Sequence, residues 1–141
     1  MTIDGANALV IPSDPFGVGC ELGDPALRRA AQDYCRQALA GLRVTNRISG
    51  DVILITAKGI KHSLHGARPP LMRSMVLLPQ IIEQASKTGE VMDKAGRPDI
   101  VAIHKYEAEL SDADAALIAL VIARESREGV KHFYDLSFLA R

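Results

Sequence analysis

The stretch "DIVAIHKYEAEL", residues 99–110, decides the fold because apolar and polar residues alternate along it. Such alternation is typical of a half-buried β-strand, in which successive side chains point to opposite faces of a sheet. Two stretches rich in β-branched and aromatic residues follow, "ALIALVIARES" at 116–126 and "VKHFYDLSFL" at 130–139. Turn residues at 111–114 and 127–129 separate the three stretches. We therefore expect consecutive strands joined as an antiparallel meander.

The N-terminal half is predicted to be mainly helical. Residues 24–41 have apolar side chains at helical spacing, with Asp24 as a plausible N-cap, Pro25 at the first helical position and Gly41 as the stop. Cys35 lies near the apolar face of this helix and is expected to be a small core residue, not a nucleophile.

Shorter elements connect this helix to the meander. Two short strands are predicted at 43–48 and 51–56, about two helical turns at 60–66, helices on either side of Pro79, and a short strand at 89–93. The expected fold is α+β, with the N-terminal helix and short helices packed on the antiparallel meander. Residues 1–23, which are rich in Gly and Pro, are expected to be an irregular arm, and residues 24–141 a single domain.

The composition restricts the classes of protein that this chain can be. Formal net charge is zero over 141 residues, and no apolar run approaches the roughly 20 residues of a membrane helix. The acidic start does not resemble a signal peptide, and two cysteines do not make a disulfide framework. We therefore expect a cytoplasmic protein without a membrane partner. Because no metal-ligand spacing is present, no metal and no other cofactor are expected.

Positive charge is concentrated in one part of this neutral chain. Residues 43–75 contain six Lys and Arg residues and a single acid, Asp51, whereas residues 76–116 are acidic. The stretch "TAKGIKHSLHGAR", 56–68, directly follows the apolar "VILI" and contains two of the four histidines; its candidate residues are Lys58, Lys61, His62, His65 and Arg68. These residues would suit a site that holds an anion and moves a proton. A solvated turn and helix would account for them equally well.

The predicted strands contribute further candidates. His104 and Tyr106 are two residues apart and therefore share one face of a strand. Arg124 and Ser126 share a face beside the predicted hairpin, which brings them close to residues 130–134, including Tyr134. An ordinary sheet edge with solvated polar groups also explains this pattern.

Several short motifs together resemble a known group of domains. The motifs are "ITAKGIKHSLHG", "LPQIIEQA", "HKYEAEL", "LVIARES" and "HFYDLS", and the resemblance that they carry covers about residues 43–138. In order and spacing they resemble the phage and conjugative-element nuclease-like domains of the Barnase–EndoU–colicin–RelE superfamily, of the type associated with large polyvalent proteins. The resemblance implies a compact α+β fold with an antiparallel sheet. It also implies a metal-independent endoribonuclease activity.

Cleavage of RNA without a metal requires a base, an acid and cations around the phosphate. We expect His62 and His104 to be the acid–base pair, in an order that the sequence does not assign. Four residues would surround the scissile phosphate: Lys61, Arg124, Ser126 and Tyr134. Lys58, His65, Arg68, Arg73 and Tyr106 would bind the nucleic acid, with Arg43 and Arg47 as further contacts to the phosphate backbone.

The leading hypothesis is therefore an endoribonuclease-like domain that acts in conflicts of mobile elements as a toxin and leaves a 2′,3′-cyclic phosphate. The partner would be RNA, with transfer RNA as a candidate target and a cognate inhibitor protein as a candidate second partner. The alternative is a non-catalytic module that binds nucleic acid or protein with the same face.

Overall fold

The computed structural model describes residues 8–18, 25–93, 99–113 and 115–139. Its α-helices are α2 (Pro25–Tyr34), α3 (Ala57–Leu64), α4 (Pro69–Ser74) and α5 (Leu78–Gln84). A π-helical turn, Cys35–Leu39, extends α2, and a 3₁₀ turn, Met75–Leu77, joins α4 to α5. The strands are β1 (Leu9–Val10), β2 (Arg43–Thr45), β3 (Val52–Leu54), β4 (Ser86–Met92), β5 (Ile100–Asp112), β6 (Ala115–Ser126) and β7 (Lys131–Leu139).

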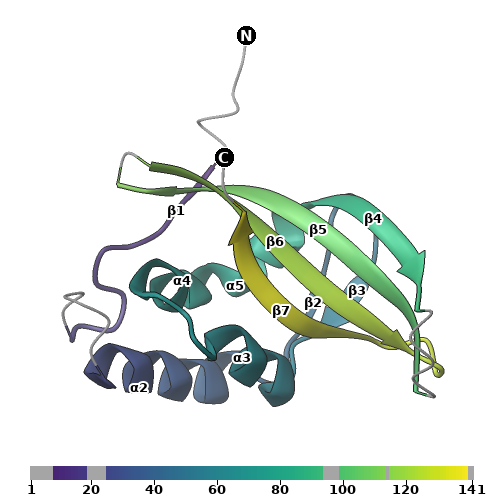
Figure 1. Cartoon of the computed structure of the whole chain (residues 1–141), viewed down its shortest axis with the longest axis horizontal. Coiled ribbons are helices and arrows are strands. Elements are labelled where there is room, and N and C mark those ends of the chain that lie inside the picture. The colour runs from purple at the N-terminus through teal and green to yellow at the C-terminus, as the bar shows by residue number, and fades with distance from the viewer. Residues whose placement is uncertain (1–7, 19–24, 94–98, 114, 140–141) are drawn as a thin grey trace, which may run out of the picture.

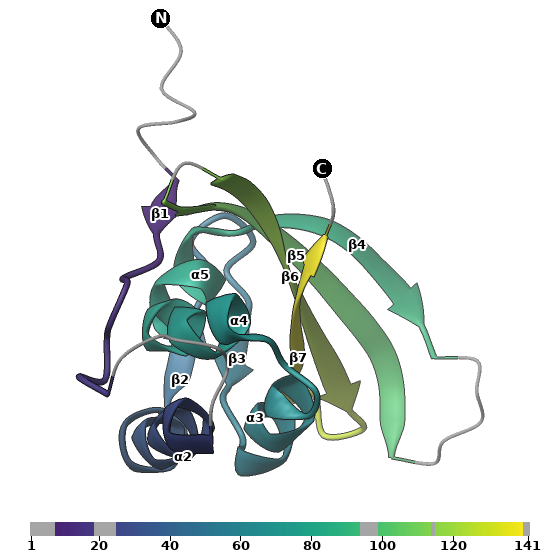
Figure 2. The same ribbon diagram turned by 60° about the vertical axis from the view of Figure 1, so that its left-hand side comes forward.

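The described strands form one curled sheet of seven, and the helices lie on one side of it (Figures 1 and 2). The strand order is β1-β5-β6-β7-β3-β2, and β4 pairs with β5. The α+β class is therefore confirmed. Strands β4 to β7 form the predicted antiparallel meander.

The sheet as a whole is mixed, which corrects the expectation of a purely antiparallel one. Strand β3 runs parallel to β7, and β1 runs parallel to β5. Strand β1 belongs to the stretch predicted as an irregular arm, and Ile11 just after it is buried in the core. These parallel pairings involve only two residue pairs each, so they leave almost no periodic signal in the sequence.

The first helix follows the sequence prediction where it is described. Leu27 and Ala31 of α2 are buried, and the chain leaves the helical region at Gly41, whose φ of 93° is in the left-handed region that glycine tolerates. The predicted N-cap, Asp24, and the other cysteine, Cys20, lie outside the described residues. Cys35 is buried, as predicted, and burial raises the pKa of its thiol to about 12. None of the described helices is long and apolar enough to cross a membrane.

A half-buried carboxylate ties β3 to the meander. Asp51, immediately before β3, accepts hydrogen bonds from Lys87 of β4 (2.9 Å) and the Tyr106 hydroxyl of β5 (2.6 Å). The ammonium of Lys131 on β7 lies 3.7 Å from its other oxygen. Burial by itself would raise the pKa of Asp51, but hydrogen bonds from Lys87, Tyr106 and Ser49 lower that pKa to about 2.

Asp51→Asn should therefore lower the free energy of unfolding at pH 7 by about 2 kcal/mol. This is the free energy that corresponds to the difference between the usual pKa of 3.8 and the folded-state pKa of about 2. Because the folded-state pKa of Asp51 is depressed, its contribution is complete above the unfolded-state pKa. It is lost as pH falls from about 4 to about 2. Urea unfolding of both proteins across this range measures the difference. The exposed Asp99→Asn is the control, and a constant difference between wild type and Asp51→Asn down to pH 2 would contradict this account.

Candidate functional site

Helix α3 takes the place of a strand beside β7. Strand β3 pairs with β7 only at Lys131 and His132, because the chain leaves the sheet after Leu54 and begins α3 at Ala57. The Thr56 side chain caps α3 by accepting from the N–H of Gly59 (3.0 Å), and it donates to the Phe133 carbonyl (3.2 Å). One helical turn further, the Ser63 hydroxyl accepts from the N–H of Leu136 (2.9 Å). Side chains of α3 thus satisfy backbone groups along the edge of β7.

This contact is possible because residue 59 is glycine. A Cβ placed on Gly59 would lie 2.0 Å from the carbonyl oxygen of Phe133, closer than any real contact. Glycine normally weakens a helix interior, so its presence in α3 reflects the close approach to β7. The approach brings the next turn of α3, which carries His62, against the residues that follow Phe133.

A β-bulge turns two consecutive polar residues of β7 away from the core. The pairing with β6 passes from Ala123↔Phe133 to Ile122↔Asp135, so Tyr134 is the extra residue. Phe133 and Leu136 are both buried, whereas Tyr134 and Asp135 between them are half-buried. Without the bulge, regular alternation would place Tyr134 and Asp135 on opposite faces.

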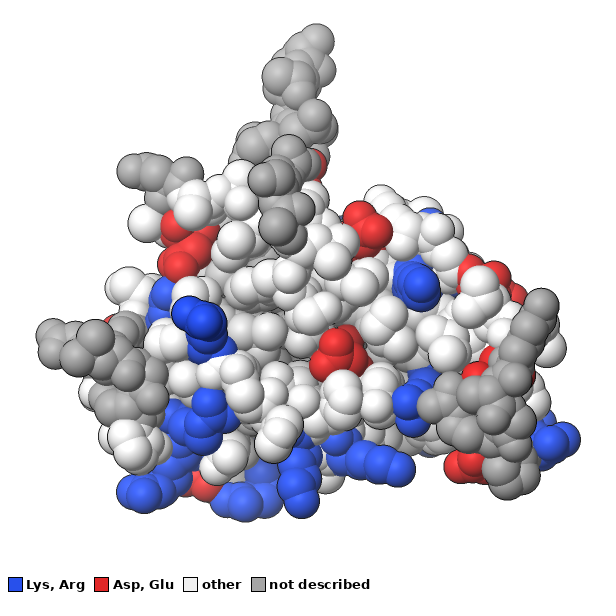
Figure 3. All heavy atoms as spheres, in the orientation of Figure 1, with Lys and Arg blue, Asp and Glu red and all other residues white. Residues whose placement is uncertain are grey.

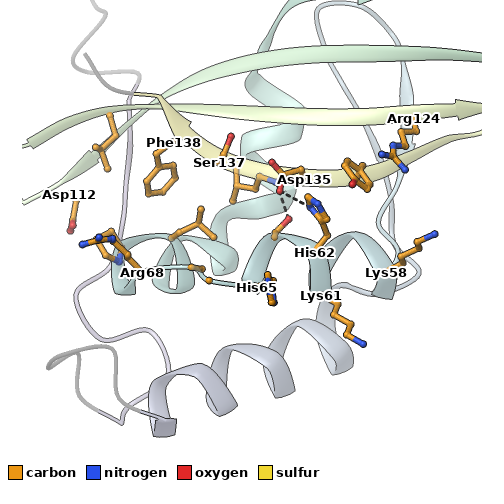
Figure 4. Close-up of a pocket in the computed structure, with 18 of the residues that line it drawn as sticks. Lys58, Lys61, His62, His65, Arg68, Asp112, Arg124, Asp135, Ser137 and Phe138 are labelled. Atoms are coloured by element: carbon orange, nitrogen blue, oxygen red, sulfur yellow. Dashed lines mark hydrogen bonds and ion pairs between the residues drawn. The ribbon is translucent and has the colours of Figure 1, made fainter. Parts of the chain in front are cut away.

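His62 and Asp135 form a hydrogen-bonded pair. The Nδ1 atom of His62 lies 3.0 Å from a carboxylate oxygen of Asp135, in Figure 4 one of the dashed contacts. An ionised carboxylate only accepts hydrogen bonds, so Nδ1 is the donor in this pair, and in the neutral imidazole this leaves a lone pair on Nε2. The His62 side chain is 45% exposed, which keeps it accessible to a ligand.

The ring of Tyr134 lies between His62 and Arg124. The His62 and Tyr134 ring centroids are 4.1 Å apart with 32° between their planes, and the Arg124 Cζ lies 3.4 Å from the same Tyr134 centroid. Two groups that close to the ring centre cannot occupy the same face, so the three side chains form a stack. The stacked cation stabilises the ring, and the stack restricts the orientation of His62.

These residues border a groove between β7 on one side and α3 and α4 on the other. Seven of the predicted site residues line it: Lys58, Lys61, His62, His65, Arg68, Arg124 and Tyr134. Within the described residues, its four Lys and Arg side chains have no carboxylate partner. Its two acids are occupied, Asp135 by His62 and Asp112 by Arg73. The groove is therefore electropositive, and Figure 4 shows Lys58 and Arg124 toward one end and Arg68 toward the other.

The groove has an apolar part as well. Leu71 of α4, Leu117 of β6, and Leu136 and Phe138 of β7 line it. An electropositive wall beside an apolar one suits a ligand that combines a phosphate with a flat, weakly polar group such as a nucleobase. No three His, Cys, Asp or Glu side chains among the described residues are grouped to hold a metal ion.

The structure does not bring His104 to this groove. His104 pairs with Ala123, and its neighbour Ile103 with Arg124, so the side chains of His104 and Arg124 lie on opposite faces of the sheet. The His104 side chain is 2% exposed, and its Nε2 lies 2.7 Å from a carboxylate oxygen of Glu125. The acid–base pair expected from His62 and His104 is corrected accordingly, because the two histidines do not face one ligand.

Three further predicted site residues are buried and bind other groups of the protein. Ser126 is buried at the hairpin, where its hydroxyl accepts from the N–H of Val130. Tyr106 is fully buried and donates to Asp51. Arg73 is 8% exposed and binds both carboxylate oxygens of Asp112. The sequence analysis expected these three side chains to contact RNA, and their burial prevents that contact.

Sequence reasoning missed Asp135, the partner of His62. Its sequence signal is the order Phe133, Tyr134, Asp135, Leu136, in which two polar residues interrupt the alternation of a strand. That interruption is typical of a bulge and could have drawn attention to both polar residues.

Comparison of the sequence with models of protein families gives a match that includes most of the helices and strands around the groove. The model of the family described as large polyvalent protein-associated domain 3 matches residues 23–133. The chain belongs to this family. The match to large polyvalent protein-associated domain 3 includes His62 and Arg124 and ends immediately before Tyr134 and Asp135. Neither the curated proteins nor the solved structures contain a match to the chain.

Gly59→Ala should separate α3 from β7 and so disturb the His62–Asp135 pair. The added methyl group meets backbone, which cannot rotate away, so we expect a loss of about 2 kcal/mol or more of unfolding free energy. Chemical denaturation measures the loss, and NMR signals of the His62 ring report its displacement. Gly89→Ala is the matched control, because a Cβ there would be at least 3.8 Å from its nearest atom. Equal stability of the two variants would contradict the proposed close approach.

Proposed function

We propose that this domain binds RNA in the groove between α3 and β7 and cleaves it by acid–base chemistry, without a metal ion. The observation that carries the proposal is the His62–Asp135 pair in a groove whose four Lys and Arg side chains have no carboxylate partner among the described residues. Unpaired cations favour a polyanionic ligand, and an oriented histidine supplies the proton transfer that phosphodiester cleavage needs.

The proposed reaction uses the 2′-hydroxyl of the RNA as nucleophile. Nε2 of His62 takes the proton of this hydroxyl while the 2′-oxygen bonds to phosphorus. The bond from phosphorus to the 5′-oxygen of the next nucleotide breaks. The products are a 2′,3′-cyclic phosphate and a 5′-hydroxyl, and Asp135 stabilises the imidazolium that forms on His62.

The other groove residues have roles that follow from their positions. Tyr134, whose ring contacts His62, would donate its hydroxyl proton to the leaving 5′-oxygen, in place of the second histidine expected from the sequence. Arg124 and Lys58 would stabilise the charge on the phosphate, and Lys61, His65 and Arg68 would bind the strand on either side.

The biological setting that we propose follows from the sequence resemblance and the family. A ribonuclease domain of the Barnase–EndoU–colicin–RelE type, associated with a large polyvalent protein, would act in the cytoplasm in a conflict between a phage or other mobile element and its host. Transfer RNA is the candidate target, and a cognate inhibitor protein would cover the groove.

A second candidate function is binding without catalysis. It is favoured by the position of His104, which leaves the groove without one of the two histidines expected for acid–base catalysis. Such a module would hold RNA through the same cations and leave it intact.

His62→Gln should lower kcat/KM for RNA cleavage by about a hundredfold to ten-thousandfold, because it removes a proton-transfer group. Tyr134→Phe should also lower kcat while keeping the stacked ring. Cleavage is measured on a labelled RNA in EDTA, with detection of the cyclic phosphate. His132→Gln is the matched control, since His132 is also on β7 and does not line the groove, and it should retain full activity.

The outcomes separate the two candidates. RNA that is bound by the wild type but not cut under any condition would support the binding module and overturn the ribonuclease. Cleavage that persists unchanged in His62→Gln would remove His62 from the reaction. Activity that disappears in EDTA and returns with a divalent cation would contradict the metal-independent scheme.

A further inference from the structure

A second groove lies on the other side of α3, between α3 and α2. Arg28, Gln32 and Arg36 line it from the first helical segment, where they recur every fourth residue. Lys61 of α3 and His65, immediately after α3, line it on the other side. None of its described lining residues is an Asp or a Glu, and the acid beside it is Asp33, which forms an exposed ion pair with Arg36.

The two grooves are continuous across the exposed surface of α3. Lys61 and His65 line both of them. In Figure 4 these two side chains extend from α3 on the side of α2, whereas His62 points to Asp135. Figure 3 shows that Lys and Arg side chains gather along the edge of the molecule formed by α2 and α3. The positive surface therefore extends past the groove that contains His62.

The two arginines of the second groove have different roles. Arg28 donates to the carbonyl oxygens of Leu64 and Ala67, which fixes the end of α3 and the segment after it. Among the residues that the structure describes, the partner of Arg36 is Asp33, in an ion pair whose side chains are 69% and 48% exposed. Exposed pairs of this kind contribute little to stability, so the Arg36 guanidinium can exchange Asp33 for a phosphate at little cost.

We infer that the groove between α2 and α3 binds the phosphate backbone of the RNA beyond the cleaved bond, so that the substrate is an extended RNA strand and not a dinucleotide. This inference rests on the proposed ribonuclease function. The second groove has no Phe, Tyr or Trp among its lining residues, and its contacts are therefore to phosphates and independent of base sequence. A strand that reaches it from His62 crosses α3, whose diameter with side chains is about 10 Å.

The test compares kcat/KM on a dinucleotide and on a longer single-stranded RNA that contains the same cleavage step. The longer strand should be cut more efficiently by the wild type. Arg36→Gln should lower kcat/KM for the longer strand by about fivefold at 0.1 M salt. It should also reduce the slope of log kcat/KM against log salt concentration by about 0.7, the value for one lost phosphate contact on a single strand. Cleavage of the dinucleotide should not change.

Two further variants sharpen this test. Asp33→Asn frees Arg36 and removes a negative charge beside it, so it should raise kcat/KM for the longer strand and leave the dinucleotide unchanged. Arg29→Gln is the control, because Arg29 is an exposed arginine of α2 that lines neither groove, and it should change neither substrate.

The results distinguish this inference from the function on which it rests. Equal kcat/KM on both substrates, or no effect of Arg36→Gln and Asp33→Asn on the longer strand, would contradict RNA binding in the second groove. Neither result would contradict the proposed ribonuclease function. Absence of cleavage on every RNA would overturn the ribonuclease. If the longer strand is then still bound, with opposite effects of Arg36→Gln and Asp33→Asn on affinity, the second groove stands as a binding surface alone.

Discussion

The close approach of α3 to the edge of β7 is the constraint on which the rest of the structure depends. Strand β3 covers only the first two residues of β7, and an uncovered edge would leave backbone groups without partners. Helix α3 supplies those partners through Thr56 and Ser63, and it can do so because Gly59 has no side chain. The same contact sets His62 against the bulge of β7. The solution to a problem of sheet stability is therefore also what assembles the candidate site.

The sequence predicted the long strands well because each is long enough for alternation to repeat. It could not predict the parallel pairings of β1 and β3, which are short and bring together segments far apart in the chain. The cations around His62 were predictable because they cluster within a few residues of the sequence. The proximity of Arg124 and Tyr134 was predictable because a hairpin joins their strands. His104 was misjudged for a physical reason. Its hydrogen-bond partner Glu125 and the nearby carboxylate of Glu90 lie on neighbouring strands, and no local sequence pattern shows that they surround a buried histidine. Asp135 was missed because the bulge reverses the face that alternation assigns to it.

The charges of this neutral chain are divided between two environments. On the side of the sheet that faces the core, Asp51, Tyr106 and His104 have partners within the protein and connect strands to one another. Around the groove, by contrast, the four Lys and Arg side chains have no carboxylate partner in the described part of the chain. Net charge therefore conceals a local excess that is available to an external anion, and a uniform mixture of paired charges would offer no such surface.

The stack of His62, Tyr134 and Arg124 connects this charge to chemistry. A histidine held only by a carboxylate could still swing about that hydrogen bond, whereas contact with the Tyr134 ring restricts its plane as well. Arg124 holds the opposite face of the same ring, so the orientation of the proton-transfer group and the position of a phosphate-binding cation are set by one side chain. Catalysis by positioning requires such pre-organisation, because a side chain that is already held in place loses little entropy when the substrate binds. The bulge that exposes Tyr134 beside Asp135 thus provides, with one additional residue, both the partner of His62 and the surface that fixes its orientation.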